Sequence, residues 1–252
     1  MAEKSRKQVI TIVGAGNLGY SLARSLTRAG FRVDQIVARD RQESLHRARK
    51  LANQVGSTAV AIPRARITSD VIWFCVPDHA IAVTAESLSR SSQWKNKIAV
   101  HSSGALSSDE LDVLRKQGAA VVAAHPLMTF VRGSRPALAG VPFGVEGDAK
   151  AVRTVRAIVR SLGGEPFAIP KSKKAAYHAW GMFTSPLLTA LLVTAEEVAQ
   201  RAGIGRKDAR RRMLPILKQT LANYESLGAA KSFSGPILRG DVATIAQHMR
   251  SL

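Results

Sequence analysis

The sequence has one cysteine, few aromatic residues and half as many acidic as basic residues. The lone Cys75 excludes a disulfide within the chain, and its place in the apolar run 71–76 predicts a buried thiol. This cysteine usage is typical of a reducing compartment, so we predict a cytoplasmic protein. The N-terminal residues MAEKSRKQ lead into a short strand rather than the apolar core of a signal peptide, so we predict no secretory signal.

The scarcity of acidic residues leaves 37 Lys and Arg against 18 Asp and Glu, a formal net charge of +19. Such a field attracts anions, including phosphorylated cofactors and nucleic acid. The basic clusters at 39–50 and 201–212 contain no aromatic side chain, whereas nucleic-acid interfaces commonly combine basic and aromatic residues. We therefore predict a solvated basic surface, no nucleic-acid partner and no bound metal.

Charged residues are absent from Ala175 to Ala195, a stretch long enough to cross a membrane. The stretch holds several polar residues and Pro186, and the chain has no second such span. A helix that is apolar on every side can equally be buried in protein, so we predict a buried helix, 174–201, that Pro186 kinks. A membrane-anchored protein is the alternative.

A glycine-rich turn near the N-terminus carries the strongest functional signal. The β-branched run Val9–Val13 leads directly into Gly14-Ala15-Gly16-Asn17-Leu18-Gly19, and a helical pattern follows to about Ala29. In a dinucleotide-binding turn the first glycine permits the sharp turn, the second admits the pyrophosphate, and the third lets the helix approach the sheet. Free N–H groups at the helix start then face the phosphates. We predict that this turn binds a dinucleotide through Gly14, Gly16, Asn17, Leu18 and Gly19.

The residues after the second predicted strand indicate which dinucleotide binds. About 20 positions beyond the glycines an acid selects the ribose hydroxyl of NAD, whereas an arginine accommodates the 2′-phosphate of NADP. Arg39 stands at this position and Arg41 follows closely, so the two side chains can hold a phosphate dianion. We predict NADP, with NAD as the less favoured alternative through Asp40.

The order of apolar runs predicts an α/β fold. Strands are expected at 9–13, 32–38, 58–62, 71–76, 97–101 and 119–124, with helical patterns between them, and short strands at 141–145 and 167–169. We predict a doubly wound parallel sheet over residues 1–169. The remainder, 170–252, is expected to be all helix, with Asp241 capping the last one.

Polar residues follow several predicted strands at the edge where ligands bind in such sheets. Val76 and Pro77 are expected beside the nicotinamide of the cofactor, and Ser102 or Ser103 can bond a substrate carbonyl or carboxylate. The two serines can equally be loop caps. His101 and His125 end their strands and can be held there by hydrogen bonds alone.

The start of the long helix offers a proton donor. Hydride transfer to C=O or C=N leaves negative charge on the oxygen or nitrogen, which a protonated lysine can neutralise. Lys174 and His178 stand four residues apart and therefore share one helix face. We predict Lys174 as the donor, although such a pair also occurs by chance on helix surfaces.

Taken together, these motifs give the chain a resemblance over nearly its whole length. It resembles the Rossmann-like oxidoreductases whose C-terminal half is the "domain of unknown function 2520", relatives of pyrroline-5-carboxylate reductase and of 6-phosphogluconate and 3-hydroxyacid dehydrogenases. The resemblance rests on the motifs Gly14–Gly19, Val76-Pro77-Asp78, His101–Gly104, His125–Phe130, Lys174–Ala179, Gly235-Pro236 and Arg239-Gly240-Asp241.

The resemblance implies an NADP-linked reductase that forms a homodimer through its helical domain, which is like the C-terminal domain of 6-phosphogluconate dehydrogenase, with the long helix buried at its centre. The hydroxyacid dehydrogenase branch uses a serine after the fifth strand and a lysine opening the long helix, which fall on Ser102 or Ser103 and on Lys174. His178 stands where that branch has asparagine, so a proton-transfer role is expected of it while the substrate class stays open. Tyr177 and Arg239 are expected at the substrate.

Two functions follow from these observations. The first is an NADP-dependent oxidoreductase that reduces a small keto acid or imine, with Lys174 as proton donor and Arg239 on a substrate carboxylate; a ketopantoate-reductase-like activity is one candidate. The second is a non-catalytic NADP-binding or sensing protein whose basic surface contacts nucleic acid or another partner. It predicts cofactor binding without turnover.

Overall fold

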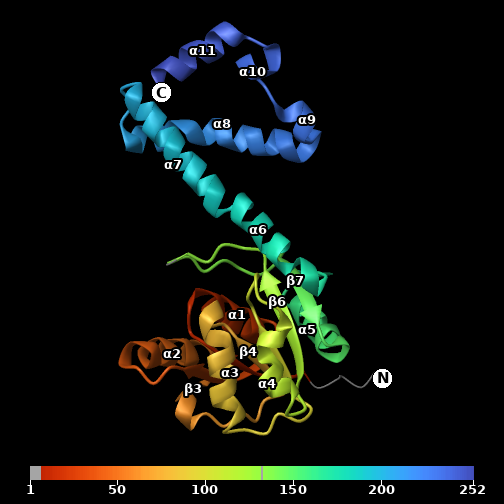
Figure 1. The fold of residues 1–252 in the computed structure, drawn as a ribbon. Coiled ribbons are helices and arrows are strands. Elements are labelled where there is room, and N and C mark those ends of the chain that lie inside the picture. The colour runs from red at the N-terminus through yellow and green to blue at the C-terminus, as the bar shows by residue number, and fades with distance from the viewer. Residues whose placement is uncertain (1–6, 132) are drawn as a thin grey trace. The chain divides into compact units, whose positions relative to one another are not determined.

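The computed structural model describes residues 7–131 and 133–252, so the N-terminal MAEKSR, where we predict no secretory signal, lies outside the described residues. The chain forms two compact units, Met1–Gly181 and Met182–Leu252. The first unit is built on a β-sheet and the second consists of helices (Figure 1). This is the α/β class with a helical C-terminal region that the sequence predicts.

The sheet of the first unit has eight strands in the order β3-β2-β1-β4-β5-β6-β7-β8. Its strands are β1 (Val9–Val13), β2 (Arg32–Ala38), β3 (Thr58–Ala61), β4 (Val71–Phe74), β5 (Ile98–His101), β6 (Ala120–Pro126), β7 (Pro142–Gly147) and β8 (Glu165–Ala168). β1 to β6 are parallel, and the strand order reverses between β1 and β4. The crevice beyond the carboxyl ends of those two strands is where ligands bind in such sheets.

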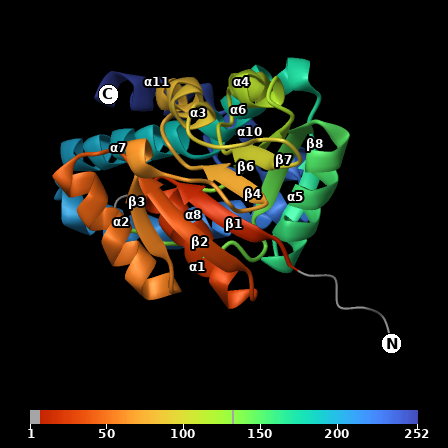
Figure 2. The same ribbon diagram turned by 90° about the horizontal axis from the view of Figure 1, so that it is seen from below.

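Helices cover both faces of the sheet (Figure 2). One face carries α1 (Asn17–Arg28), α2 (Gln42–Val55) and α5 (Ala149–Ser161), and the other carries α3 (Ile81–Ser89) and α4 (Asp112–Arg115). Side chains alternate along each strand, so Trp73 packs into the first core while Ile72 and Phe74 pack into the second. Strands buried on both faces explain why the strand segments read as continuous apolar runs.

One edge of the sheet departs from the predicted parallel arrangement. β7 pairs with β6 in the antiparallel direction, and β8 is parallel to β7. The chain between β6 and β7 passes through an irregular segment, and a parallel return would need a crossover connection such as a helix. α5 then supplies such a crossover between β7 and β8. The predicted doubly wound parallel sheet is therefore confirmed as a mostly parallel sheet, with β6 and β7 antiparallel at this edge.

The C-terminal region is helical throughout. Its helices are α6 (Lys174–Thr184), α7 (Pro186–Arg201), α8 (Arg206–Leu227), α9 (Ala229–Ser232), α10 (Pro236–Arg239) and α11 (Val242–Ser251). The long predicted helix breaks at Ser185, and Pro186 begins α7, which confirms the predicted kink. The Asp241 carboxylate accepts the N–H of Thr244 at 3.0 Å and caps α11 as predicted.

The two compact units divide later along the chain than the boundary predicted after residue 169. A short 3₁₀ turn, Lys171–Lys173, leads into α6, whose first turns belong to the first unit. Lys174 and Tyr177 are only 3% and 8% exposed there. These two side chains pack into the sheet-bearing unit, so the helix starts in one unit and continues into the other.

The stretch Lys171–Arg201 is long and apolar enough to cross a membrane by length and composition alone. Only 6% of its most apolar window is buried. The prediction of a helix buried within the protein is therefore wrong for a single chain, because this chain covers so little of it.

Candidate functional site

The glycine turn after β1 has the geometry that the motif requires. Gly14 has a φ of +108°, and a Cβ there would stand 2.6 Å from the carbonyl oxygen of Cys75. A Cβ on Gly19 would stand 2.0 Å from the carbonyl oxygen of Gly14, so α1 approaches the turn closely. Gly16 has nothing within 4 Å of its Cβ position, which leaves an open approach to the backbone at the start of α1.

A cavity of about 740 Å³ opens over this turn. It is lined by the glycine turn, the end of β2, the first turns of α2 and the segment after β4. The volume lies within the range of pockets that hold cofactors. Six of the nine predicted cofactor residues line the cavity: Gly14, Gly16, Asn17, Arg39, Val76 and Pro77. The other three, Leu18, Gly19 and Arg41, do not line it.

The structure separates the three charged residues that follow β2. Arg39 lines the cavity, Arg41 is the exposed N-cap residue of α2, and Asp40 forms an ion pair with Arg64 at 3.4 Å. His46 and Arg47 were missed in the sequence, although both line the same cavity one turn along α2. Their spacing from Arg39 could be read from the sequence, but only the packing of α2 brings all three residues to the same cavity.

The residues of this cavity fit a dinucleotide. The glycine turn leaves backbone N–H groups open to a pyrophosphate, and Arg39 lines the wall after β2, where the adenosine of a dinucleotide lies in such folds. Asp40, the residue that would favour NAD, is turned to Arg64 and does not line the cavity.

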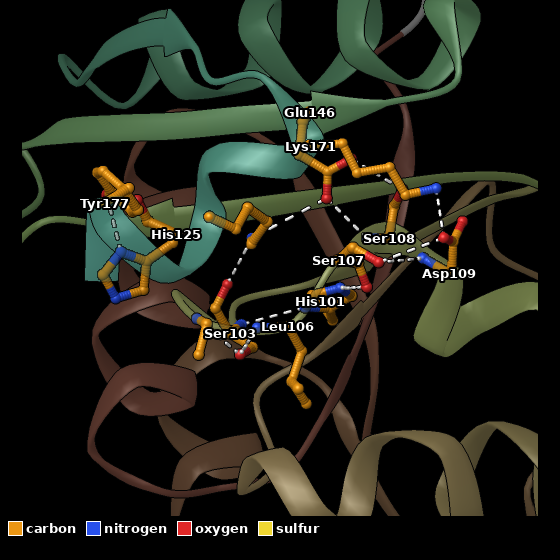
Figure 3. A network of polar contacts seen from close by, with 12 residues as sticks. His101, Ser103, Leu106, Ser107, Ser108, Asp109, His125, Glu146, Lys171 and Tyr177 are labelled. Atoms are coloured by element: carbon orange, nitrogen blue, oxygen red, sulfur yellow. Dashed lines mark hydrogen bonds and ion pairs between the residues drawn. The ribbon is translucent and has the colours of Figure 1, made fainter. Parts of the chain in front are cut away.

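The two candidate serines after β5 have different roles in the structure. The Ser103 hydroxyl donates to Asp78 at 2.8 Å and accepts from the backbone N–H groups of Ala105 and Leu106. Figure 3 shows Ser103 beside Leu106 in this turn. Ser103 is therefore fully engaged in shaping its turn. The Ser102 hydroxyl accepts from the Trp73 indole at 2.8 Å, and its own proton has no acceptor among the residues that the structure describes.

His101 is a structural residue of the same turn. Its Nε2 donates to the carbonyl of Ser107 at 2.9 Å, and its Nδ1 accepts the backbone N–H of Ser103 at 3.1 Å. Burial lowers the pKa of His101 to about 4, so the ring is neutral at pH 7. The hydrogen bonds fix one tautomer, and both ring nitrogens are used.

Lys174 is buried beneath this turn. Its ammonium donates to the carbonyl of Ser103 at 2.9 Å and lies 4.0 Å from Glu146, which itself accepts from the N–H and hydroxyl of Ser108. Burial lowers the pKa of Lys174 to about 8, and the charges of Glu146 and Asp78 oppose that shift. Glu146 on β7 was missed in the sequence, because only the antiparallel pairing of β7 brings it to this place.

The remaining residues of α6 gather at the end of β6. Tyr177 contacts His125 through a 2.8 Å hydrogen bond, and the ring of His178 packs edge-on against His125 with 6.1 Å between centroids. Lys174, Tyr177 and His178 therefore all reach the strand ends, as predicted for the start of this helix. Arg239 is exposed in α10 of the second unit, and its contact with substrate stays a prediction.

The strand order, the glycine turn at its reversal point and the cavity above it define a Rossmann-type nucleotide-binding domain followed by a helical domain. Two family models match the chain: a Rossmann-like domain over residues 2–126 and the domain of unknown function DUF2520 over residues 141–252. The chain thus carries both domains, which confirms the resemblance seen in its sequence. Among curated proteins no sequence matches it significantly.

Solved structures share the whole fold. A Bacteroides fragilis protein assigned as an NADP oxidoreductase is 22% identical, with a TM-score of 0.78 over 97% of this chain and 90% of its own. A Thermotoga maritima protein is 26% identical, with a TM-score of 0.74 over 96% of this chain and 88% of its own. Pyrroline-5-carboxylate reductase from Coxiella burnetii is 13% identical, with a TM-score of 0.67 over 97% and 93%. At these identities the similarity establishes the fold.

Proposed function

We propose that the protein is an NADPH-dependent oxidoreductase that reduces a small keto acid or imine. One observation carries the proposal: a dinucleotide-sized cavity with Arg39 on its wall extends to Val76 and Pro77, and a cluster of proton-bearing side chains follows the neighbouring strands β5 and β6. The structures of similar fold support an oxidoreductase, since two of them are named as oxidoreductases or reductases.

The residues at the strand ends supply acid catalysis and orientation in this proposal. When bound, NADPH supplies the hydride. The free hydroxyl proton of Ser102 bonds the substrate, and Lys174 gives a proton to the oxygen or nitrogen that becomes negative. A pKa of about 8 suits this role, because the lysine is mostly protonated at pH 7 yet gives up its proton more readily than an exposed lysine.

The proposed substrate class follows from the hydrogen-bond donors at the site. The Lys174 ammonium and the neutral imidazole of His125 favour a substrate that accepts hydrogen bonds, such as a keto acid or an imine, while Glu146 and Asp78 offset the charge of the lysine. Pyrroline-5-carboxylate, which names one enzyme of similar fold, is a cyclic imine with a carboxylate. Arg239 is the proposed partner of such a carboxylate.

The test is to follow oxidation of NADPH by its absorbance across a panel of keto acids, imines and aldehydes. We expect turnover with at least one carboxylated keto acid or imine. Tight NADPH binding without turnover on the whole panel contradicts the enzyme and favours the non-catalytic alternative. That alternative also requires nucleic-acid affinity that falls steeply with salt; two arginines of its basic cluster, Arg210 and Arg211, already pair with Glu196 and Asp208.

We also propose that the protein is a homodimer joined by its helical unit. Large apolar side chains are exposed on that unit in the single chain, and soluble monomers rarely expose so many. They include Leu191 at 64%, Ile216 at 68% and Leu221 at 60%. A second copy is the occupant that the resemblance implies.

Light scattering in detergent-free buffer tests the dimer. We expect the mass of two chains of 27.0 kDa, and dissociation in the double variant Leu191→Glu/Leu221→Glu. The exposed Lys116→Glu in the first unit is the control and should leave the mass unchanged. A stable monomer contradicts the dimer, and a chain that stays in solution only with detergent supports the membrane-anchored alternative.

A further inference from the structure

His125, at the end of β6, is held by a tyrosine from α6. Its Nδ1 lies 2.8 Å from the Tyr177 hydroxyl, and the two rings meet edge to face with centroids 5.5 Å apart (Figure 3). Tyr177 is only 8% exposed, so the pair is packed inside the first unit. The tyrosine therefore fixes the orientation of the imidazole.

The other ring nitrogen of His125 points to the serine turn. A Cβ on Gly104 would lie 2.9 Å from Nε2 of His125 and 2.7 Å from the His178 ring. Only a glycine at 104 lets the imidazole come so close to this turn. The turn also carries Ser102, and its Ser103 carbonyl accepts a hydrogen bond from Lys174. Within the described residues, Nε2 has no hydrogen-bond partner. A polar atom without a partner at this place is available to a ligand.

The proton of the imidazole is expected on Nε2. Burial raises the pKa of Tyr177 to about 12, against a smaller opposite effect of a hydrogen bond from the Gly144 backbone, so the phenol keeps its proton. Because its oxygen accepts that backbone bond, the phenol has one proton to donate, and its nearer acceptor is Nδ1 of His125 at 2.8 Å rather than the His125 carbonyl oxygen at 3.3 Å. Burial, and then the charge of Lys174, lower the pKa of His125 to about 4, so the ring is neutral at pH 7 with its single proton on Nε2.

We propose that His125 is a further catalytic residue, whose Nε2–H donates a hydrogen bond to the substrate oxygen or nitrogen at which negative charge develops. This inference rests on the proposed function. As hydride reaches the carbon of C=O or C=N, the π electron pair moves to the heteroatom, and the Lys174 ammonium transfers its proton there. His125 keeps its proton throughout and acts as a preorganised electrostatic donor. Tyr177 is a positioning residue that sets the tautomer.

Kinetics of three variants with the best substrate of the panel test this role. Loss of one such donor lowers kcat by about 10²–10³-fold, so we expect that loss in His125→Ala with little change in KM. His125→Gln, which restores an N–H near Nε2, should recover part of it. Tyr177→Phe should lower kcat less than His125→Ala, and Tyr224→Phe, an exposed tyrosine of α8, is the matched control.

A second readout does not depend on turnover. In full-length protein labelled with ¹⁵N histidine, NMR should show the His125 proton on Nε2, and Tyr177→Phe should give a mixture of tautomers. A proton on Nδ1 in the unmodified protein, or a kcat of His125→Ala within threefold of the unmodified enzyme, overturns the proposal. Failure of the whole panel would instead overturn the proposed function, while the NMR result would still show whether Tyr177 sets the tautomer.

Discussion

Replacement of Lys174 by methionine should lower kcat for reduction by about 10²–10⁴-fold, the range that a positioned proton donor contributes. KM should change little, because the ammonium acts on charge that develops only in the transition state. The side chain is only 3% exposed and donates to the Ser103 carbonyl, so the loss is measured by steady-state kinetics on protein shown to be folded.

The folding control for this variant concerns Glu146. Removing one partner of a buried ion pair leaves a charge without compensation, at a cost of about 3–5 kcal/mol. The double variant Lys174→Met/Glu146→Gln removes both charges and should fold better while remaining equally inactive. Lys173→Ala, in the preceding exposed turn, should keep full activity. A Lys174→Met enzyme within tenfold of the unmodified kcat would rule out the proposed donor.

The pH dependence of the reaction gives the same residue a second test. The pKa of Lys174 is lowered from 10.5 to about 8, so the rate of reduction should fall as pH rises through about 8. From about pH 8 to 10.5 the unfolded chain holds this proton more tightly than the folded chain, so the contribution of Lys174 to stability rises with pH there. Deprotonation of Lys174 therefore does not destabilise the fold in this pH range, so unfolding caused by this residue does not explain the loss of rate. An unchanged pH profile in Lys174→Met contradicts the assignment.

Replacement of Arg39 by alanine should raise the Kd for NADPH by about 10–100-fold, while the Kd for NADH changes little. Hydrogen bonds to charged groups contribute about 1.5–3 kcal/mol, and this arginine lines the cavity at the adenosine end. The effect is selective because the two cofactors differ only in the 2′-phosphate. Fluorescence titration of the reduced nicotinamide measures both constants.

Two further arginines sharpen that experiment. Arg49→Ala, on an exposed position of α2, is the control and should leave both constants unchanged. Arg41→Ala should raise the Kd for NADPH less than Arg39→Ala, because Arg41 does not line the cavity. If the unmodified protein binds NADH as tightly as NADPH, or if Arg39→Ala weakens both equally, the preference for NADP is wrong.

Local patterns predicted much of the fold correctly. The strand, glycine turn and helix at residues 9–29 follow from contacts between near neighbours, and so does the break at Pro186. The antiparallel pairing of β7 at the edge of the sheet was not predicted, since it depends on the path of the irregular segment before β7. The prediction that the long helix is buried was also wrong for a single chain, because apolar composition does not say which surface covers a helix.

The candidate site divides in the same way. The sequence placed Lys174 and the serines near the strand ends, but two adjacent serines look alike until their partners are known. Those partners are Trp73, which lies on β4, and Asp78, which follows β4, whereas the serines follow β5. The pairing of His125 with Tyr177 joins residues 52 positions apart.

The sequence by itself determined the glycine turn after β1, the arginine after β2 and the order of strands and helices, because each depends on spacing along the chain. The tertiary structure alone decided which serine keeps a free proton, that Glu146 lies beside Lys174, and that His125 faces Gly104. These features are contacts between separate strands and helices. Burial and charge in those contacts also set the protonation of the lysine and the histidine.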